Sequence, residues 1–233
     1  MPTIYLIRHG QASFGQQNYD QLSDLGKQQA AHLGSAWKQR LPGFDAVALG
    51  TMHRHQQTAE LCLAEMGQNL HEVNASFDAG WNEYDHQDIL AQLRPELATA
   101  ASTDEFIKQQ ANPKQAFEKV FNDAIYRWID GEHDQDYVES WQAFRNRTRD
   151  ALNTVADEHK DARNIAVFTS GGPISLLSQY LLGVPERNLM RMNWTLVNCG
   201  VTKIVSTKNR MFVASLSQHV HFEGDHQHFI TYR

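Results

Sequence analysis

The amino-acid sequence predicts an α/β fold: a mostly parallel sheet with flanking helices, one antiparallel strand near the C-terminus and an inserted helical lid. Apolar strand-like runs alternate with helical patterns along most of the 233 residues, which is the order expected of parallel strands joined by helices. A segment at about residues 86–137 interrupts the alternation, because it holds helical patterns but no strand-like run. We therefore expect a single domain over residues 1–233 with this segment inserted.

Strands are expected at five short apolar runs set between helical patterns. The last two runs are separated only by TKNR at 207–210, a connection short enough for a hairpin, so this pair is expected to be antiparallel. The five runs are TIYLIRH at 3–9, FDAVALG at 44–50, NIAVFTS at 164–170, GVTKIVS at 200–206 and MFVASLS at 211–217.

Helices are indicated by caps and by the spacing of apolar residues. Ser23 is expected to cap a helix that has Asp24 in its first turn. A further helix is expected after Ser140, where residues recur at helical spacing. These residues are Trp141, Phe144, Thr148, Leu152 and Val155. Within the inserted segment the helical pattern is represented by PKQAFEKVFNDAIYRWIDG at 113–131.

Composition narrows the class of protein. A formal charge of −6 argues against a general nucleic-acid binder, because no basic stripe is available to displace counterions from phosphates. No run approaches the roughly 18 apolar residues of a membrane span. The two cysteines, Cys62 and Cys199, lack metal-type spacing and are expected to be thiols in the core. We expect a soluble cytoplasmic protein without a nucleic-acid or membrane partner.

Three of the predicted strands end in residues that suit phosphate chemistry. Arg8 and His9 end the first strand, Arg54 follows the second, and Ser170 precedes two glycines and a proline after the third. The carboxyl ends of parallel strands share one edge, so these groups are expected to converge. Two guanidiniums can hold a phosphoryl group, free amides at Gly171 and Gly172 can face its oxygens, and a neutral imidazole can attack phosphorus without a metal or cofactor.

These residues also carry a family resemblance. LIRHGQAS with YDQLSDLGKQQA, then RHQQTAE, then VFTSGGPI, resemble the histidine phosphatase superfamily, the phosphoglycerate mutase-like proteins. The resemblance implies that His9 is the nucleophile that forms a phosphohistidine, and that Arg8 and Arg54 bind the phosphoryl oxygens. It also implies that Glu83, in AGWNEYD, is the carboxylate that protonates the leaving oxygen and later activates water.

The sequence departs from the family pattern at two places. Ser170 stands where the family usually has a second histidine, so we expect lower catalytic power and a gain in kcat from Ser170→His. Ala12 and Gly15 replace the common Ser and Asn after the first motif, and Ser13 is expected to substitute as a phosphate-binding residue.

Other histidines are considered as substitutes or ligands. His53 and His55 flank Arg54, and one of them is near enough to reach the pocket. Because the start of a helix directs neighbouring side chains apart, we expect that neither of them does. Four histidines near the C-terminus lack the carboxylate or cysteine spacing of a metal site, so no metal is expected there. They are His219, His221, His226 and His228, of which His221 falls where the resemblance places a supporting histidine.

The preferred interpretation is a phosphatase that hydrolyses a small phosphate monoester through a phosphohistidine. A phosphoglycerate mutase is the alternative enzyme, and a catalytically weak phosphate-binding protein is the alternative of another class. A mutase must retain a bisphosphorylated intermediate, yet the inserted segment offers few cations among many acids. These cations are Arg94, Lys108, Lys114, Lys119 and Arg127. The oligomeric state stays open, because Phe117 and Trp128 fit either packing in the lid or the face of a homodimer.

Overall fold

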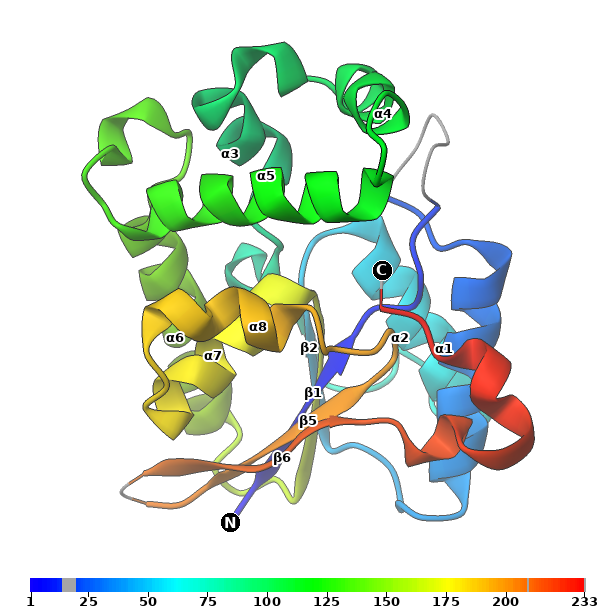
Figure 1. Ribbon diagram of the computed structural model, residues 1–233. Coiled ribbons are helices and arrows are strands. Elements are labelled where there is room, and N and C mark those ends of the chain that lie inside the picture. The colour runs from blue at the N-terminus through cyan, green and yellow to red at the C-terminus, as the bar shows by residue number, and fades with distance from the viewer. Residues whose placement is uncertain (14–19, 209, 233) are drawn as a thin grey trace. The chain divides into compact units, whose positions relative to one another are not determined.

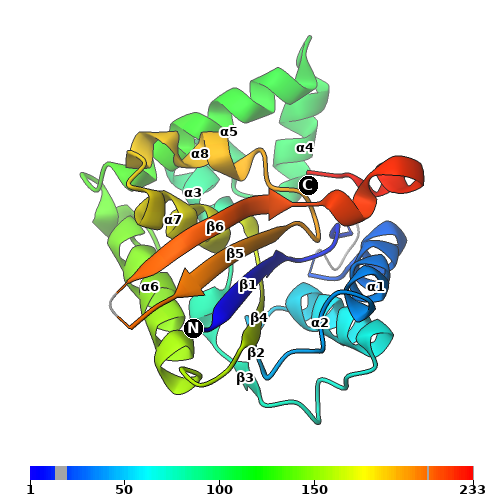
Figure 2. The ribbon, with the colours of Figure 1, turned by 90° about the horizontal axis from the view of Figure 1, so that it is seen from below.

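In the computed structural model, which describes residues 1–13, 20–208 and 210–232, six strands form one sheet in the order β3-β2-β4-β1-β5-β6 (Figures 1 and 2). The strands are β1 (Thr3–Arg8), β2 (Ala46–Leu49), β3 (Ala75–Phe77), β4 (Asn164–Thr169), β5 (Val201–Ser206) and β6 (Met211–Gln218). β1, β2, β3 and β4 pair in parallel, whereas β5 is antiparallel to both of its neighbours, β1 and β6. The predicted fold class, including its antiparallel strand near the C-terminus, is therefore confirmed.

The chain divides into two compact units, Met1–Glu83 with Thr148–Arg233, and Tyr84–Arg147. The first unit contains the sheet and the helices that cover it. These helices are α1 (Asp24–Lys38), α2 (His53–Met66), α7 (Gly171–Leu182), α8 (Leu189–Asn193) and the C-terminal part of α6 (Trp141–Glu158).

Alternation along β1 explains why helices cover both faces of the sheet. Tyr5 and Ile7 pack into a core with residues of α1 and α2, whereas Ile4 and Leu6 pack into a second core with residues of α6 and α7. Successive side chains of a strand point to opposite faces, so a strand that is apolar throughout needs cover on both. Figure 2 shows α1 and α2 on one side of the sheet and α7 on the other.

The first residues of α1, α2 and α7 are placed by a side-chain cap and by the register of the parallel strands. Ser23 accepts a hydrogen bond from the Gly26 amide at 3.0 Å and so caps α1, as predicted. The register of the parallel strands brings the carboxyl ends of β1, β2 and β4 together, with Arg8 opposite Thr169 and Leu49 opposite Phe168. The starts of α2 and α7 therefore lie at the same edge of the sheet.

The second unit holds α3 (His86–Leu93), α4 (Ala100–Lys108), α5 (Pro113–Ile129) and the beginning of α6. Trp128 is fully buried there and its ring lies 5.2 Å from that of Tyr84 and 5.1 Å from that of Trp141. Trp128 therefore packs within this unit and is not part of an exposed face. The predicted insertion at 86–137 falls inside the unit, and its role as a lid stays a prediction.

Two observations concern the class of protein. No helix among the described residues is long and apolar enough to cross a membrane. Cys62 and Cys199 are both buried and unpaired, as expected of core thiols.

Candidate functional site

His9 lies at the end of β1 and is 7% exposed. Its backbone amide donates to the Thr169 carbonyl at 2.9 Å, which ties the residue to the end of β4. Its Nδ1 lies 2.6 Å from the Gly10 carbonyl oxygen. A carbonyl can only accept, so Nδ1 carries the hydrogen and the lone pair is on Nε2.

The charge state of His9 follows from its surroundings. Burial lowers its pKa well below the usual value, and the positive charge of Arg54 lowers it further, followed by His55 and Arg8. The hydrogen bond to Gly10 opposes this shift but does not reverse it. The imidazole is therefore neutral near pH 7 and has an available lone pair at Nε2.

The glycine that follows His9 is required by a close backbone contact. A Cβ at Gly10 would lie 2.4 Å from the carbonyl oxygen of Gly26 in α1, too close for any side chain. The Gly10 amide donates to Thr58 Oγ1 of α2 at 3.1 Å. These contacts hold the loop after β1 against both helices.

Arg54 lies in the first turn of α2 and is buried. Its Nη1 donates to Oδ1 of Asp20 at 2.8 Å, and the other oxygen of Asp20 accepts from the His53 amide at 2.9 Å. Asp20 therefore orients the guanidinium while it holds the start of the helix. Asp20 was not predicted as a site residue, because its position between the first motif and the helix capped by Ser23 offers no distinguishing signal.

Arg8 makes contacts that the sequence did not predict. Its Nη1 donates to the carbonyl oxygens of Leu196 and of Tyr232, the latter at 2.9 Å. The guanidinium thus links β1 to two distant segments of the chain. Its charge nevertheless reaches the nucleophile candidate, since Arg8 contributes to the lowered pKa of His9.

Glu83 lies at the N-terminus of α7. The Gly172 amide donates to both of its carboxylate oxygens, at 3.0 and 3.2 Å. Thr169 Oγ1 donates to the Trp81 carbonyl at 2.6 Å, which anchors the segment before Glu83 to the end of β4. The structure therefore brings Glu83 to the predicted edge of the sheet, where one of the two expected amides already holds its carboxylate.

Ser170 and His55 form the most unexpected contact at this edge. Ser170 Oγ and His55 Nε2 lie 2.7 Å apart, and both residues are fully buried. The ring centroids of His55 and His9 are 5.7 Å apart. His53, by contrast, is exposed. The expectation that neither flanking histidine reaches the pocket was wrong for His55, because the helix start directs His53 outward and His55 inward.

Ser13 and Gly171 complete the predicted site residues. Ser13 is 8% exposed, and its amide donates to the Gln21 carbonyl at 2.8 Å. Gly15 lies outside the described residues. Gly171 begins α7, and a Cβ there would lie 2.6 Å from Asn193 Oδ1 and 3.7 Å from Arg8 Nε. Gly171 is therefore required by the close approach of Asn193, and the Arg8 guanidinium lies beside the same position.

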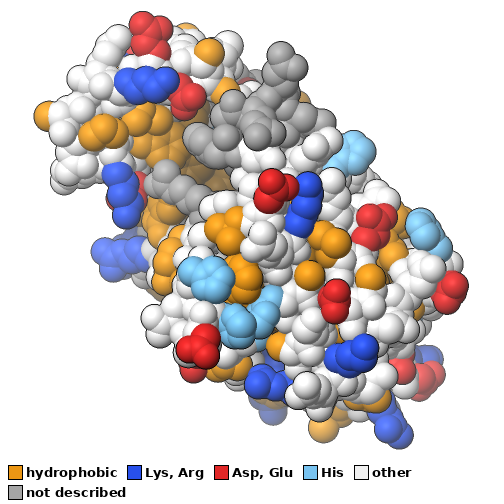
Figure 3. All heavy atoms as spheres, turned by 90° about the vertical axis from the view of Figure 1, so that its right-hand side faces the viewer, with side chains coloured by type: hydrophobic (Ala, Val, Ile, Leu, Met, Phe, Trp, Pro, Cys, Tyr) orange, Lys and Arg blue, Asp and Glu red, His pale blue; other side chains and the backbone are white. Residues whose placement is uncertain are grey.

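The C-terminal histidines lie apart from this arrangement. His226 and His228 are exposed, and histidines gather on the face drawn in Figure 3. His221 is buried and hydrogen bonds to the backbone of Cys199, and burial lowers its pKa to about 4. Among the residues that the structure describes, no group of three or more His, Cys, Asp or Glu residues is arranged to hold a metal ion.

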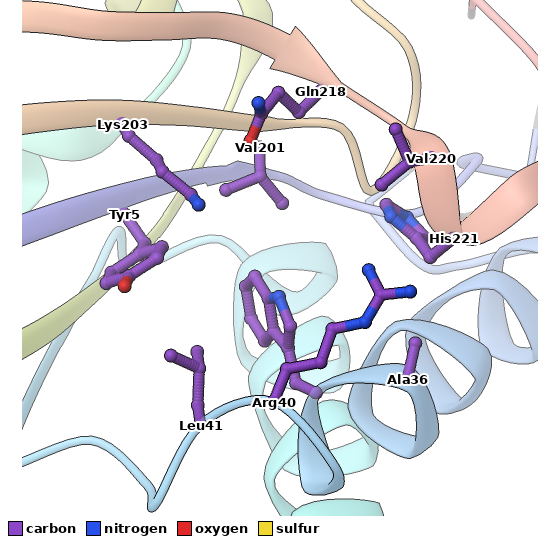
Figure 4. Close-up of a pocket in the computed structure, with 10 residues that line it drawn as sticks. Tyr5, Ala36, Arg40, Leu41, Val201, Lys203, Gln218, Val220 and His221 are labelled. Atoms are coloured by element: carbon purple, nitrogen blue, oxygen red, sulfur yellow. The ribbon is translucent and has the colours of Figure 1, made fainter.

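His221 also lines a cavity of about 320 Å³ between α1 and β5 (Figure 4). Arg40 extends towards His221, and Lys203 lies beside the ring of Tyr5, with its Nζ 5.4 Å from the ring centroid. None of the candidate phosphate-binding residues lines this cavity. The candidate site is therefore the edge at which β1, β2 and β4 end.

Comparisons with known proteins identify the family and the fold of the chain. A model of the histidine phosphatase superfamily (branch 1) matches residues 4–219. A 2,3-bisphosphoglycerate-dependent phosphoglycerate mutase of Methylocella silvestris is 33% identical over 101 residues, which cover 41% of this chain. That match spans about half of the mutase, 48% of its length.

Solved structures of similar fold include enzymes of two kinds. Phosphoglycerate mutase from Bacillus anthracis has a TM-score of 0.65 at 18% identity and covers 94% of each chain. A phosphoserine phosphatase variant from Entamoeba histolytica in complex with phosphoserine has a TM-score of 0.64 at 19% identity, covering 95% of this chain and 99% of the other. At these identities the likeness concerns the fold.

Proposed function

Because the chain belongs to the histidine phosphatase superfamily, we propose that it hydrolyses a small phosphate monoester through a phosphohistidine on His9, without a metal. The observation that carries this proposal is the state of His9. The Gly10 carbonyl holds the hydrogen on Nδ1, and burial and neighbouring cations keep the ring neutral. An imidazole in this state presents Nε2 as a nucleophile.

The proposed reaction has two steps. In the first, His9 Nε2 attacks phosphorus, the bond from phosphorus to the ester oxygen breaks, and Glu83, which enters this step protonated, gives its proton to the departing alcohol. In the second, Glu83 takes a proton from water, the water oxygen attacks phosphorus, and the bond from phosphorus to Nε2 breaks. Inorganic phosphate leaves, and both residues return to their starting states.

The remaining site residues are assigned to binding. Arg54 is held by Asp20 with its buried guanidinium at the edge of the sheet, and Arg8 adds a second positive charge. Ser13 and Gly171 would supply neutral donors to the phosphoryl oxygens. Such groups, fixed before the substrate arrives, stabilise the charge that is redistributed in the transition state.

Phosphoglycerate mutase activity is the second candidate, and the stretch that is 33% identical to a mutase favours it. The cations of the second unit favour hydrolysis, because most of the few that this segment offers already pair with carboxylates. The pairs are Arg94 with Glu96, Lys114 with Glu118, Lys119 with Asp123 and Arg127 with Asp136. A phosphate-binding protein without activity is the remaining alternative.

A labelling experiment tests the proposal. The protein is assayed with an aryl phosphate with and without EDTA, and it is quenched in alkali after mixing with a ³²P-labelled phosphate ester. We expect hydrolysis that EDTA does not abolish and an alkali-stable, acid-labile label that is absent from His9→Ala. His53→Ala, which changes an exposed histidine, should label like the parent. Unchanged labelling of His9→Ala would overturn the assignment of the nucleophile.

A further inference from the structure

Ser170 occupies the position before α7 that usually caps a helix, yet its hydroxyl does not cap it. Serine at this position normally accepts from an amide of the first turn. In this chain no such bond is formed, and the hydroxyl instead lies 2.7 Å from Nε2 of His55. The side chain of Ser170 is therefore directed away from the helix it precedes and towards α2.

The fold provides a fitted space for the His55 ring. The ring is fully buried, and a Cβ at Gly50 would lie 2.2 Å from its Nδ1, so only glycine at position 50 leaves room for it. The opposite nitrogen meets Ser170, and the ring lies 5.7 Å from that of His9. This placement connects the end of β2, the start of α2 and the end of β4 beside the proposed nucleophile.

The hydrogen on the His55 ring can be assigned from its partners. Burial, and secondarily the charge of Arg54, lowers the pKa of His55 well below its usual value, so the ring is neutral and has one N–H. Among the described residues Nδ1 has no hydrogen-bond partner. A buried N–H without an acceptor is rarer than a buried acceptor without a donor. The hydrogen is therefore placed on Nε2, which donates to Ser170 Oγ.

Because His55 donates this hydrogen bond, the Ser170 hydroxyl hydrogen is available for another acceptor. We propose that His55 is a positioning residue, which donates to Ser170 and so directs the Ser170 hydroxyl towards a phosphoryl oxygen of the substrate at His9. The inference rests on the proposed function and deepens it. A hydrogen bond received by a hydroxyl oxygen also strengthens the bond that the same hydroxyl donates. Two residues from different elements thus supply one donor where the sequence shows only a serine.

The first test treats the two residues as one unit. His55→Phe keeps a planar ring at this position without the donor, and Ser170→Ala removes the hydroxyl. We expect each to lower kcat for an aryl phosphate by about 10²-fold, with a smaller change in KM, since loss of one preorganised donor commonly costs about 10²–10³-fold. The double variant should lose no more than the worse single variant. Losses that multiply, or parent-like kcat in folded His55→Phe, would overturn the proposal. His53→Phe is the matched control and should behave like the parent.

The second test relocates the imidazole. The double variant His55→Ala with Ser170→His removes the imidazole from α2 and introduces one at the residue that follows β4. We expect it to recover at least tenfold in kcat over His55→Ala alone, a gain that a purely structural role of His55 does not predict. A folded double variant without this recovery would contradict the proposal.

Two measurements separate failure of this inference from failure of the proposed function. Long-range ¹H–¹⁵N correlations in the parent, with His55→Phe for assignment, should show the hydrogen on Nε2, and a hydrogen on Nδ1 would overturn the proposal whether or not any variant folds. Orthovanadate binding should weaken in His55→Phe and in Ser170→Ala, again without a further loss in the double variant. Parent protein that binds vanadate but hydrolyses no ester would refute the function and leave the His55–Ser170 inference to be decided by these two measurements.

Discussion

Acid should destabilise the protein partly through His221, and replacing this residue by asparagine should remove that part. His221 is 9% exposed, and burial, with the nearby His32, lowers its pKa from 6.5 to about 4. Between these values the unfolded chain binds a proton that the folded protein does not. The contribution of His221 is therefore fully present above about pH 6.5 and is lost as the pH falls towards the folded-state pKa.

The magnitude follows from these two pKa values. At pH 5 the imidazole is almost fully protonated in the unfolded chain and mostly neutral in the folded protein, which favours unfolding by about 30-fold, or about 2 kcal/mol. Below pH 4 the effect levels off at about 3 kcal/mol. Because domains of this kind are stable by only about 5–15 kcal/mol, a change of this size is readily measured.

Urea unfolding at pH 8 and pH 5 is the assay. The His221→Asn variant retains a side-chain N–H for the Cys199 backbone but has no group that titrates in this range. Between the two pH values its free energy of unfolding should fall by about 2 kcal/mol less than that of the parent. His226→Asn, at an exposed position of the same segment, should lose as much as the parent. Equal losses in the parent and in His221→Asn, at unchanged m-values, would show that His221 does not contribute to the acid sensitivity.

Three further predictions concern the site. Glu83→Gln should slow hydrolysis of an alkyl phosphate by about 10²–10⁴-fold but that of nitrophenyl phosphate much less, and equal losses would exclude the acid role. Asp20→Asn, which replaces the carboxylate that orients Arg54 at 2.8 Å, should weaken vanadate binding measured by isothermal titration, whereas unchanged affinity would show that Arg54 needs no such support. Ser170→His alone should lower kcat in steady-state assays instead of raising it, because the His55 ring already fills the space beside Ser170. A gain of tenfold would restore the expectation drawn from the sequence.

The central strands of the sheet were predictable, because strands that are buried on both faces appear in the sequence as continuous apolar runs. β1, β2 and β4 lie between other strands and are covered on both faces, so each appears in the sequence as an unbroken apolar run. β3, at residues Ala75–Phe77, was missed because it is a three-residue edge strand with no buried residue. Its pairing with β2 depends on the neighbouring strand and not on a local pattern.

The residues at the edge of the sheet were predictable from topology, but their partners were not. His9, Arg54 and Ser170 could be placed together because parallel strands end at a common edge. The contacts of Arg8 with the carbonyl oxygens of Leu196 and Tyr232 join positions 188 and 224 residues apart in the chain. No local pattern encodes such a contact, since any residue offers a carbonyl oxygen.

His55 shows how a correct local rule led to a wrong expectation. Successive helical residues are about 100° apart, so positions 53 and 55 point in nearly opposite directions and at most one can face the sheet edge. This rule excludes that both histidines face the sheet edge, but it does not exclude that one of them does. The sequence contained the information to choose: a serine where a histidine is usual, a histidine next to Arg54, and Gly50 at the end of the preceding strand. Each is unremarkable alone. Only the geometry, with Nδ1 of His55 against Gly50 and Nε2 against Ser170, shows that the three positions depend on one another. A substitution at any of them should therefore be interpreted together with the other two.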